Sequence, residues 1–146
     1  MSTPANARRF TVAEYLRMAK IGILRPDERV ELIDGQIDGQ IVAMSPQSPT
    51  HAALVSRLSR RLMSVFPEDR FCVRTRCTMA AGEDYAPEPG LAVVSGRCED
   101  HEHELPRTAV LVIEVADSSL RLDRGRKSDL YGRAATPFRV AELLPV

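Results

Sequence analysis

The sequence predicts an α/β (α+β) fold in which a mixed central sheet is flanked by helices. Three observations carry this prediction: two segments with helical periodicity, an Asp-Gly hairpin signal between them, and several aliphatic runs of strand length after them. At 146 residues, the chain has the size of one compact domain. We expect residues 1–9 to form a flexible arm and residues 10–146 to form this domain.

Each predicted helix begins at a recognisable cap. Thr11 and Glu14 have the spacing of a capping box, so a short helix is expected to start there and to stop near Gly22. Ser48 followed by Pro49 is typical of a second helix start. The second helix then carries apolar residues at the three-and-four spacing of one helix face: Ala52, Val55, Leu58, Leu62 and Val65.

A hairpin is predicted between the helices. The strand at residues 30–33 runs into Asp34-Gly35, a pair that favours tight two-residue turns. The tetrapeptide Ile-Asp-Gly-Gln, which contains this turn, repeats at once as residues 37–40, and only one of the two copies can form the turn. We expect the partner strand at residues 41–44.

Five later segments complete the predicted domain. Residues 71–79 alternate apolar with polar side chains, which favours a half-exposed strand. The aliphatic runs 91–94 and 110–115 are typical of strands that are covered on both faces. Residues 126–131 predict a short helix, and residues 138–144 form either a last strand or a frayed end.

Charge and composition narrow the classes of function. Lys+Arg 20 and Asp+Glu 20 give a formal net charge of zero, which argues against a purely electrostatic nucleic-acid binder. A local basic patch stays open, because Arg57, Arg60 and Arg61 lie off the apolar stripe; a solvated face is the simplest interpretation, and phosphate contact is the alternative. No apolar run approaches the roughly 20 residues of a membrane span. Three cysteines without CxxC spacing make a disulfide framework unexpected and favour a reducing cytoplasm.

Glu114 stands inside an otherwise aliphatic strand. A buried, ionised carboxylate is costly unless a charge partner or a metal ion compensates it. Glu31 and Lys127 are the residues that could form a metal-dependent site together with Glu114. Carboxylates bind Mg²⁺ or Mn²⁺, and a lysine offsets the negative charge that develops on a phosphate during its hydrolysis. Spacing alone does not single out a metal site, since any soluble domain offers some trio of this kind.

Five blocks of the sequence resemble a known family. In order over residues 9–137 they are RFTVAEYLRMAKIGI, RVELIDGQI, VAMSPQSPTHAALVSRL, PEPGLAVV and VLVIEVADSSLRLDRGRKSDLYGRAATP. Together they resemble the Uma-type family of restriction endonucleases, which belongs to the PD-(D/E)XK nuclease superfamily. The resemblance implies a restriction-endonuclease-like fold, and hydrolysis of DNA phosphodiesters that depends on Mg²⁺ or Mn²⁺.

The resemblance also implies roles for three residues. Glu31 of VELIDG matches the family's helix-proximal acid, and Glu114 of VIEVADSS matches the superfamily's second carboxylate, so both are expected as catalytic residues and metal ligands. The superfamily lysine normally lies two residues after that glutamate, where this chain has Ala116. Lys127 of DRGRK matches the position to which this family has moved the lysine, and it would stabilise the phosphate electrostatically.

The chain departs from the family pattern at position 90. The family block reads PEPDLAVV-like, with an aspartate as a metal ligand, whereas Gly90 has no side chain. Glu88 is the nearest substitute, but it lies about 6.6 Å away along a strand, which one extra methylene cannot span. We therefore expect weak or absent endonuclease activity; the alternative is a non-catalytic DNA-binding or interaction protein on a degenerate nuclease scaffold.

Three further features leave alternatives open. Residues 136–146 match the family's last strand only loosely, so truncation is expected as one interpretation, and a bare sheet edge would then favour a homodimer. His51 lies in the block that matches the family's SPxxxH, where a role near the active site and a local role at the helix start are both open. Residues 98–103 contain metal-ligating types within one short loop, for which a solvated loop is the preferred interpretation.

Overall fold

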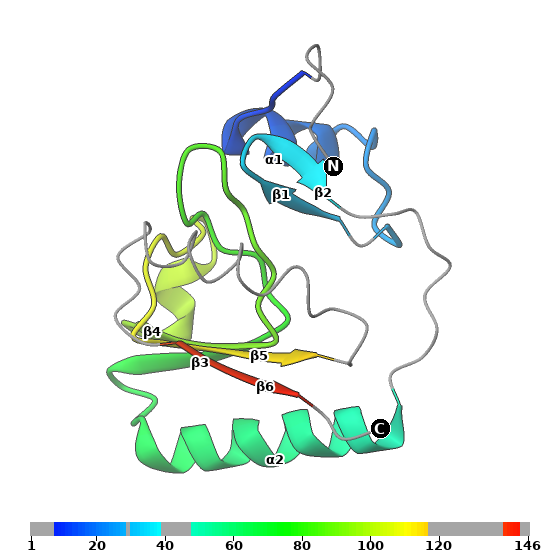
Figure 1. The fold of residues 1–146 in the computed structure, drawn as a ribbon. Coiled ribbons are helices and arrows are strands. Elements are labelled where there is room, and N and C mark those ends of the chain that lie inside the picture. The colour runs from blue at the N-terminus through cyan, green and yellow to red at the C-terminus, as the bar shows by residue number, and fades with distance from the viewer. Residues whose placement is uncertain (1–7, 29, 39–47, 117–138, 144–146) are drawn as a thin grey trace.

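The computed structural model describes residues 8–28, 30–38, 48–116 and 139–143. Its elements are helix α1 (Val12–Lys20), strands β1 (Glu31–Ile33) and β2 (Gln36–Asp38), helix α2 (Pro49–Val65), strands β3 (Phe71–Thr75) and β4 (Leu91–Ser95), the 3-10 helix η1 (Cys98–His101), and strands β5 (Leu111–Ala116) and β6 (Arg139–Leu143). The predicted α/β class is confirmed (Figure 1). The predicted arm, residues 1–9, lies mostly outside the described residues, and the domain boundary stays a prediction.

The main sheet contains four strands in the order β3-β4-β5-β6. β4 is antiparallel to both β3 and β5, whereas β5 and β6 run parallel, so the sheet is mixed as predicted. Thr75 pairs with Leu91, and Leu91 pairs with Ile113. The start of β4 therefore lies at the same end of the sheet as the ends of β3 and β5.

Helix α2 covers one face of this sheet (Figure 1). The Ser48 side chain accepts a hydrogen bond from the His51 N–H, which confirms the predicted cap. The apolar side of the helix packs on the sheet residues Leu91, Val93, Ile113 and Val115 through Leu54, Val55, Leu58, Leu62 and Phe66. The prediction was wrong for Val65, which is 60% exposed, because Phe66 takes the place four residues after Leu62. Within the described ranges, no helix combines the length and the apolar character that crossing a bilayer requires.

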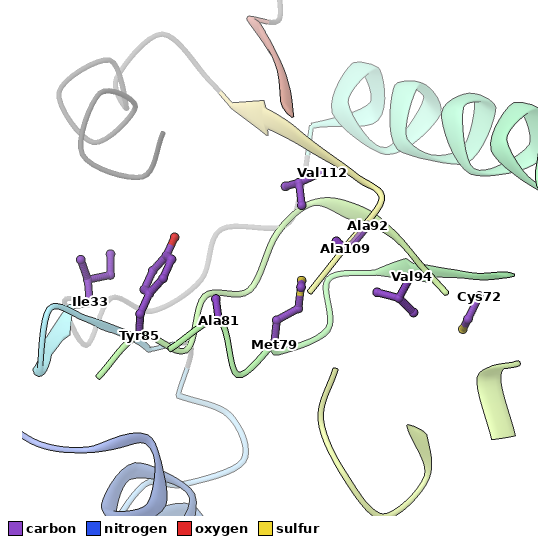
Figure 2. Close-up of a cluster of buried hydrophobic side chains, with 9 residues drawn as sticks. All are labelled: Ile33, Cys72, Met79, Ala81, Tyr85, Ala92, Val94, Ala109 and Val112. Carbon is purple, nitrogen blue, oxygen red and sulfur yellow. The ribbon is translucent and has the colours of Figure 1, made fainter. Parts of the chain in front are cut away.

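The opposite face of the sheet carries a second buried cluster (Figure 2). Strand alternation directs Ala92 and Val94 of β4 and Val112 of β5 to this side. The segment between β3 and β4, together with β1, covers them with Met79, Ala81, Tyr85 and Ile33. By the same alternation Glu114 shares the face of Val112, which is the face turned away from α2.

The β1–β2 hairpin turns at the first Asp-Gly pair. Asp34 and Gly35 have φ values of 56° and 72°, as a type I′ turn requires, and Ile33 pairs with Gln36. The partner strand predicted at residues 41–44 is therefore wrong: the partner is β2, because the tight turn closes the hairpin at the first available position. Residues 41–44 themselves lie outside the described residues.

Helix α1 and the hairpin pack together beside the start of β4. The capping box is confirmed, since Glu14 N–H donates to Thr11 Oγ1 at 3.2 Å and Thr11 N–H donates to Glu14 Oε2 at 2.9 Å. Leu32 is fully buried and exchanges two backbone hydrogen bonds with Ala86. Tyr15 of α1 packs against both. The hairpin is thus joined to the segment that leads into β4.

A disulfide joins Cys72 to Cys98, contrary to the expectation from the cysteine pattern. Cys72 lies in β3 and Cys98 begins η1, and their Cα atoms are 4.9 Å apart. The physical reason is the antiparallel return of β4, which pairs Ser95 with Phe71 and so brings the next residues back beside the start of β3. The free cysteine is Cys77.

Candidate functional site

Gly90 and Glu114 lie on neighbouring strands at one end of the sheet. Leu91 pairs with Ile113, so one further step of the antiparallel ladder sets Gly90 opposite Glu114. A Cβ atom at position 90 would lie 3.2 Å from the Ile113 carbonyl oxygen and 3.3 Å from the Val115 nitrogen, the backbone atoms on either side of Glu114. Glu114 itself is half-buried, between the buried Ile113 and Val115 in β5. The residue that lacks a ligand side chain therefore faces the strand glutamate directly.

Glu31 is attached to the same segment from the hairpin side. Its Oε1 accepts a hydrogen bond of 2.9 Å from the Glu88 N–H, two residues before Gly90. Both glutamates are half-buried. Glu31 thus contacts the stretch 87–90 at the Glu88 backbone, and Glu114 lies beside the same stretch at Gly90. Their roles as catalytic residues and ligands stay predictions.

Tyr15 supports the position of Glu31. In the sequence, Tyr15 is predicted only as part of the apolar side of the first helix, and no local pattern indicates this contact. The Tyr15 hydroxyl donates a 2.7 Å hydrogen bond to the Val30 carbonyl, immediately before Glu31. Burial raises the pKa of Tyr15 above its ordinary value of 10.0, and the nearby carboxylates of Glu88 and Glu31 raise it further. Helix α1 therefore holds the backbone next to Glu31 through a neutral, buried phenol.

Tyr15→Phe is expected to lower the free energy of unfolding by about 1 kcal/mol, because it leaves the Val30 carbonyl without this donor. The raised pKa also sets a pH dependence. The unfolded chain ionises this tyrosine near pH 10.0 and the folded chain resists, so the contribution is present below that pH and is lost as the pH rises above it. Urea unfolding of both proteins from neutral pH to about pH 11 measures this. A difference between them that does not shrink above pH 10 would contradict it.

The described residues do not complete a metal site. Within the described ranges, no three side chains of His, Cys, Asp or Glu gather closely enough to hold a metal ion. Gly90 offers no donor atom, and one oxygen of Glu31 already accepts the Glu88 N–H. The donor set that the family resemblance implies is therefore incomplete in this part of the chain.

The other candidate residues fall in three places. Lys127 and the predicted helix 126–131 lie outside the described residues. The His51 backbone N–H takes part in the cap of α2, and its side chain is half-buried. In the segment 98–103, Cys98 is in the disulfide and His101 Nε2 lies 3.2 Å from the Ser95 carbonyl oxygen, so these two groups have local partners.

The described chain thus has an α/β fold with a mixed sheet, and its two candidate glutamates lie beside the segment that leads into β4. A family model described as "Uma2: Putative restriction endonuclease" matches residues 12–138. The chain therefore belongs to the Uma2 family, and the resemblance seen in the sequence is confirmed.

A solved structure has the same fold. It is described as a "putative nuclease belonging to DUF820" from Anabaena variabilis, and it superposes with a TM-score of 0.63 at 18% sequence identity. The match covers 92% of this chain and 73% of that chain. At this identity the likeness shows the fold alone. No curated protein matches this chain.

Proposed function

We propose that this chain is a DNA endonuclease of the Uma2 family, dependent on Mg²⁺ or Mn²⁺, whose activity is weak or lost. Membership of the family supports phosphodiester hydrolysis of DNA and the use of a divalent metal. The observation that carries the reduced activity is Gly90, which faces Glu114 where the family pattern has a ligating aspartate. In this proposal Glu31 and Glu114 are metal ligands, and Lys127 offsets charge on the phosphate.

Plasmid nicking tests this proposal. In Mg²⁺ or Mn²⁺ the unmodified chain is expected to convert supercoiled DNA at a rate close to background, and Glu114→Gln is expected to abolish whatever conversion remains. Glu104→Gln is a matched control, since Glu104 is an exposed acid in the loop before β5 and pairs only with the exposed Arg107 among the ion pairs of the described residues. Robust nicking that depends on Glu114 would show that Gly90 does not limit the activity. Nicking that survives Glu114→Gln would remove the assigned role of this residue.

A second candidate function is a DNA-binding protein that keeps the nuclease scaffold without catalysis. The same observation at Gly90 favours it, because the site lacks one ligand while the fold is retained. The two candidates differ in their need for metal. A binding protein retains DNA in EDTA with strong salt dependence, and it does not gain nicking when a carboxylate is restored at position 90.

Two related proposals concern the setting of this activity. A DNA substrate supports a cytoplasmic location, which the cysteines no longer support because Cys72 and Cys98 are joined. A homodimer would suit cleavage of both strands, since each copy cuts one; sedimentation of the purified chain tests it.

A further inference from the structure

Helix α2 presents a surface with positive charge alone. Arg57, Arg60 and Arg61 are exposed, and no acidic residue occurs anywhere in the seventeen residues of the helix. We call these three residues the α2 arginine surface. Arg60 and Arg61 follow Arg57 by three and four residues, so both lie about 5–6 Å further along the axis on the same side of the helix, next to each other.

The α2 arginine surface gathers three arginines without acidic partners on one helix, whereas the other described arginines without an ion pair, such as Arg17 and Arg70, lie on separate elements. Arg8, Arg25, Arg97 and Arg107 each form an ion pair with a nearby acid. In the described residues, no ion pair or side-chain hydrogen bond involves the three guanidinium groups of α2. In a chain with zero net charge, this concentrates uncompensated positive charge on one helix.

The chemistry of this surface fits phosphate groups. A guanidinium donates two parallel hydrogen bonds to a phosphate, and arginine is the usual residue where such contacts matter. A phosphate backbone can approach this side of the helix closely, because the neighbouring exposed residues Ala53, Ser56 and Ser64 are small. Both serine hydroxyls donate hydrogen bonds to backbone carbonyls of the helix itself. A row of guanidinium groups one helical turn long can therefore contact successive phosphates of a backbone.

A lipid surface fits less well. A helix that binds at a bilayer inserts its apolar side among the acyl chains. In α2 this side is packed on the main sheet through residues such as Leu58 and Leu62. The helix thus has no apolar face left to insert, although Met63 and Val65 are exposed singly.

The α2 arginine surface is also separate from the candidate site. Glu114 shares the sheet face of Val112, whereas α2 covers the other face (Figure 1). The sheet and a helix about 10 Å across lie between the two. A phosphate at Glu114 is therefore out of reach of these arginines.

We propose that the α2 arginine surface binds backbone phosphates of a DNA segment other than the one at the candidate site. The proposal rests on the proposed function only in taking DNA as the polyanion. It adds a docking surface that needs no metal, and it holds whether or not the chain cuts DNA.

Binding of a fluorescein-labelled DNA duplex in EDTA, followed by anisotropy over a salt series, tests the proposal. The test protein is R57Q/R60Q/R61Q, and the control R25Q/R97Q/R107Q removes the same formal charge from ion-paired positions. Loss of three phosphate contacts reduces the slope of log K against log salt by about 2.7. From about 50 to about 200 mM salt, the unmodified chain should thus lose about 40-fold more affinity than the test protein. The control should keep the slope of the unmodified chain.

Three results would overturn the proposal. One is no DNA binding by the unmodified chain in EDTA, and another is an equal loss of slope in both triple variants, which would reflect net charge alone. The third is loss of binding to phosphatidylserine vesicles, with DNA binding unchanged, in the test protein. Plasmid nicking is measured in a separate experiment, so the DNA-binding results in EDTA can be interpreted even if the endonuclease proposal fails. Circular dichroism of both variants checks that exposed Arg→Gln changes leave the fold intact.

Discussion

Gly90→Asp is expected to give the chain Mn²⁺-dependent plasmid nicking at least about 100-fold faster than the unmodified chain. Position 90 faces Glu114, so a carboxylate there adds the oxygen ligand that the candidate site lacks. Loss of a group that only supports a metal ligand already costs about 10- to 100-fold in affinity or activity, and a direct ligand should matter at least as much. The variant should also be stabilised by Mn²⁺ in thermal unfolding, because the ion binds the folded state alone.

Gly90→Ala is the matched control for this experiment. Both substitutions add a Cβ atom 3.2–3.3 Å from the backbone of β5, so the adjoining strand must yield by a few tenths of an ångström in each. Only the aspartate brings a carboxylate. Equal behaviour of the two variants in nicking and in Mn²⁺ stabilisation would contradict the assignment of position 90, and activity of Gly90→Asp that survives Glu114→Gln would contradict that of Glu114.

Cys98→Ser is expected to lower the free energy of unfolding by about 3.5 kcal/mol and the Tm by on the order of 10 °C. The disulfide closes a loop across a sequence separation of 26, and its removal restores that chain freedom to the unfolded state. Cys98 is exposed, so the substitution creates no cavity, whereas Cys72 is buried in the core. Calorimetry without reductant measures the change.

Cys77→Ser is the control, since Cys77 is free. It should leave the Tm nearly unchanged. A reductant should lower the Tm of the unmodified chain to that of Cys98→Ser and should not affect Cys98→Ser itself. If reductant leaves the unmodified chain unchanged, the bridge does not contribute to stability in solution.

Local signals predicted the described elements of the fold well. The caps at Thr11 and Ser48 are side-chain hydrogen bonds within three residues, so their spacing in the sequence is sufficient. The partner of β1 was not predictable in this way, because the repeated tetrapeptide offered two equivalent Asp-Gly turns. The disulfide depends on the pairing of β3 with β4, which is a contact between distant segments and leaves no local pattern.

The candidate site was predictable in part. Glu114 could be identified because burying an ionised carboxylate within an aliphatic strand is costly without a compensating charge or metal. Gly90 could be identified only by comparison with the family pattern. The attachment of Glu31 to Glu88, and of Tyr15 to Val30, joins segments far apart in the chain. Such contacts depend on how the β1–β2 hairpin packs against helix α1 and the segment before β4. Composition and periodicity do not predict them.

The Glu31 carboxylate has a structural role as well as being a candidate metal ligand, because it accepts the hydrogen bond from the Glu88 backbone. Truncating it to alanine would leave the Glu88 N–H without its acceptor, so a loss of activity would not distinguish a local change of structure ahead of β4 from the loss of a metal ligand. Glutamine keeps the acceptor oxygen and removes the charge, which separates the two.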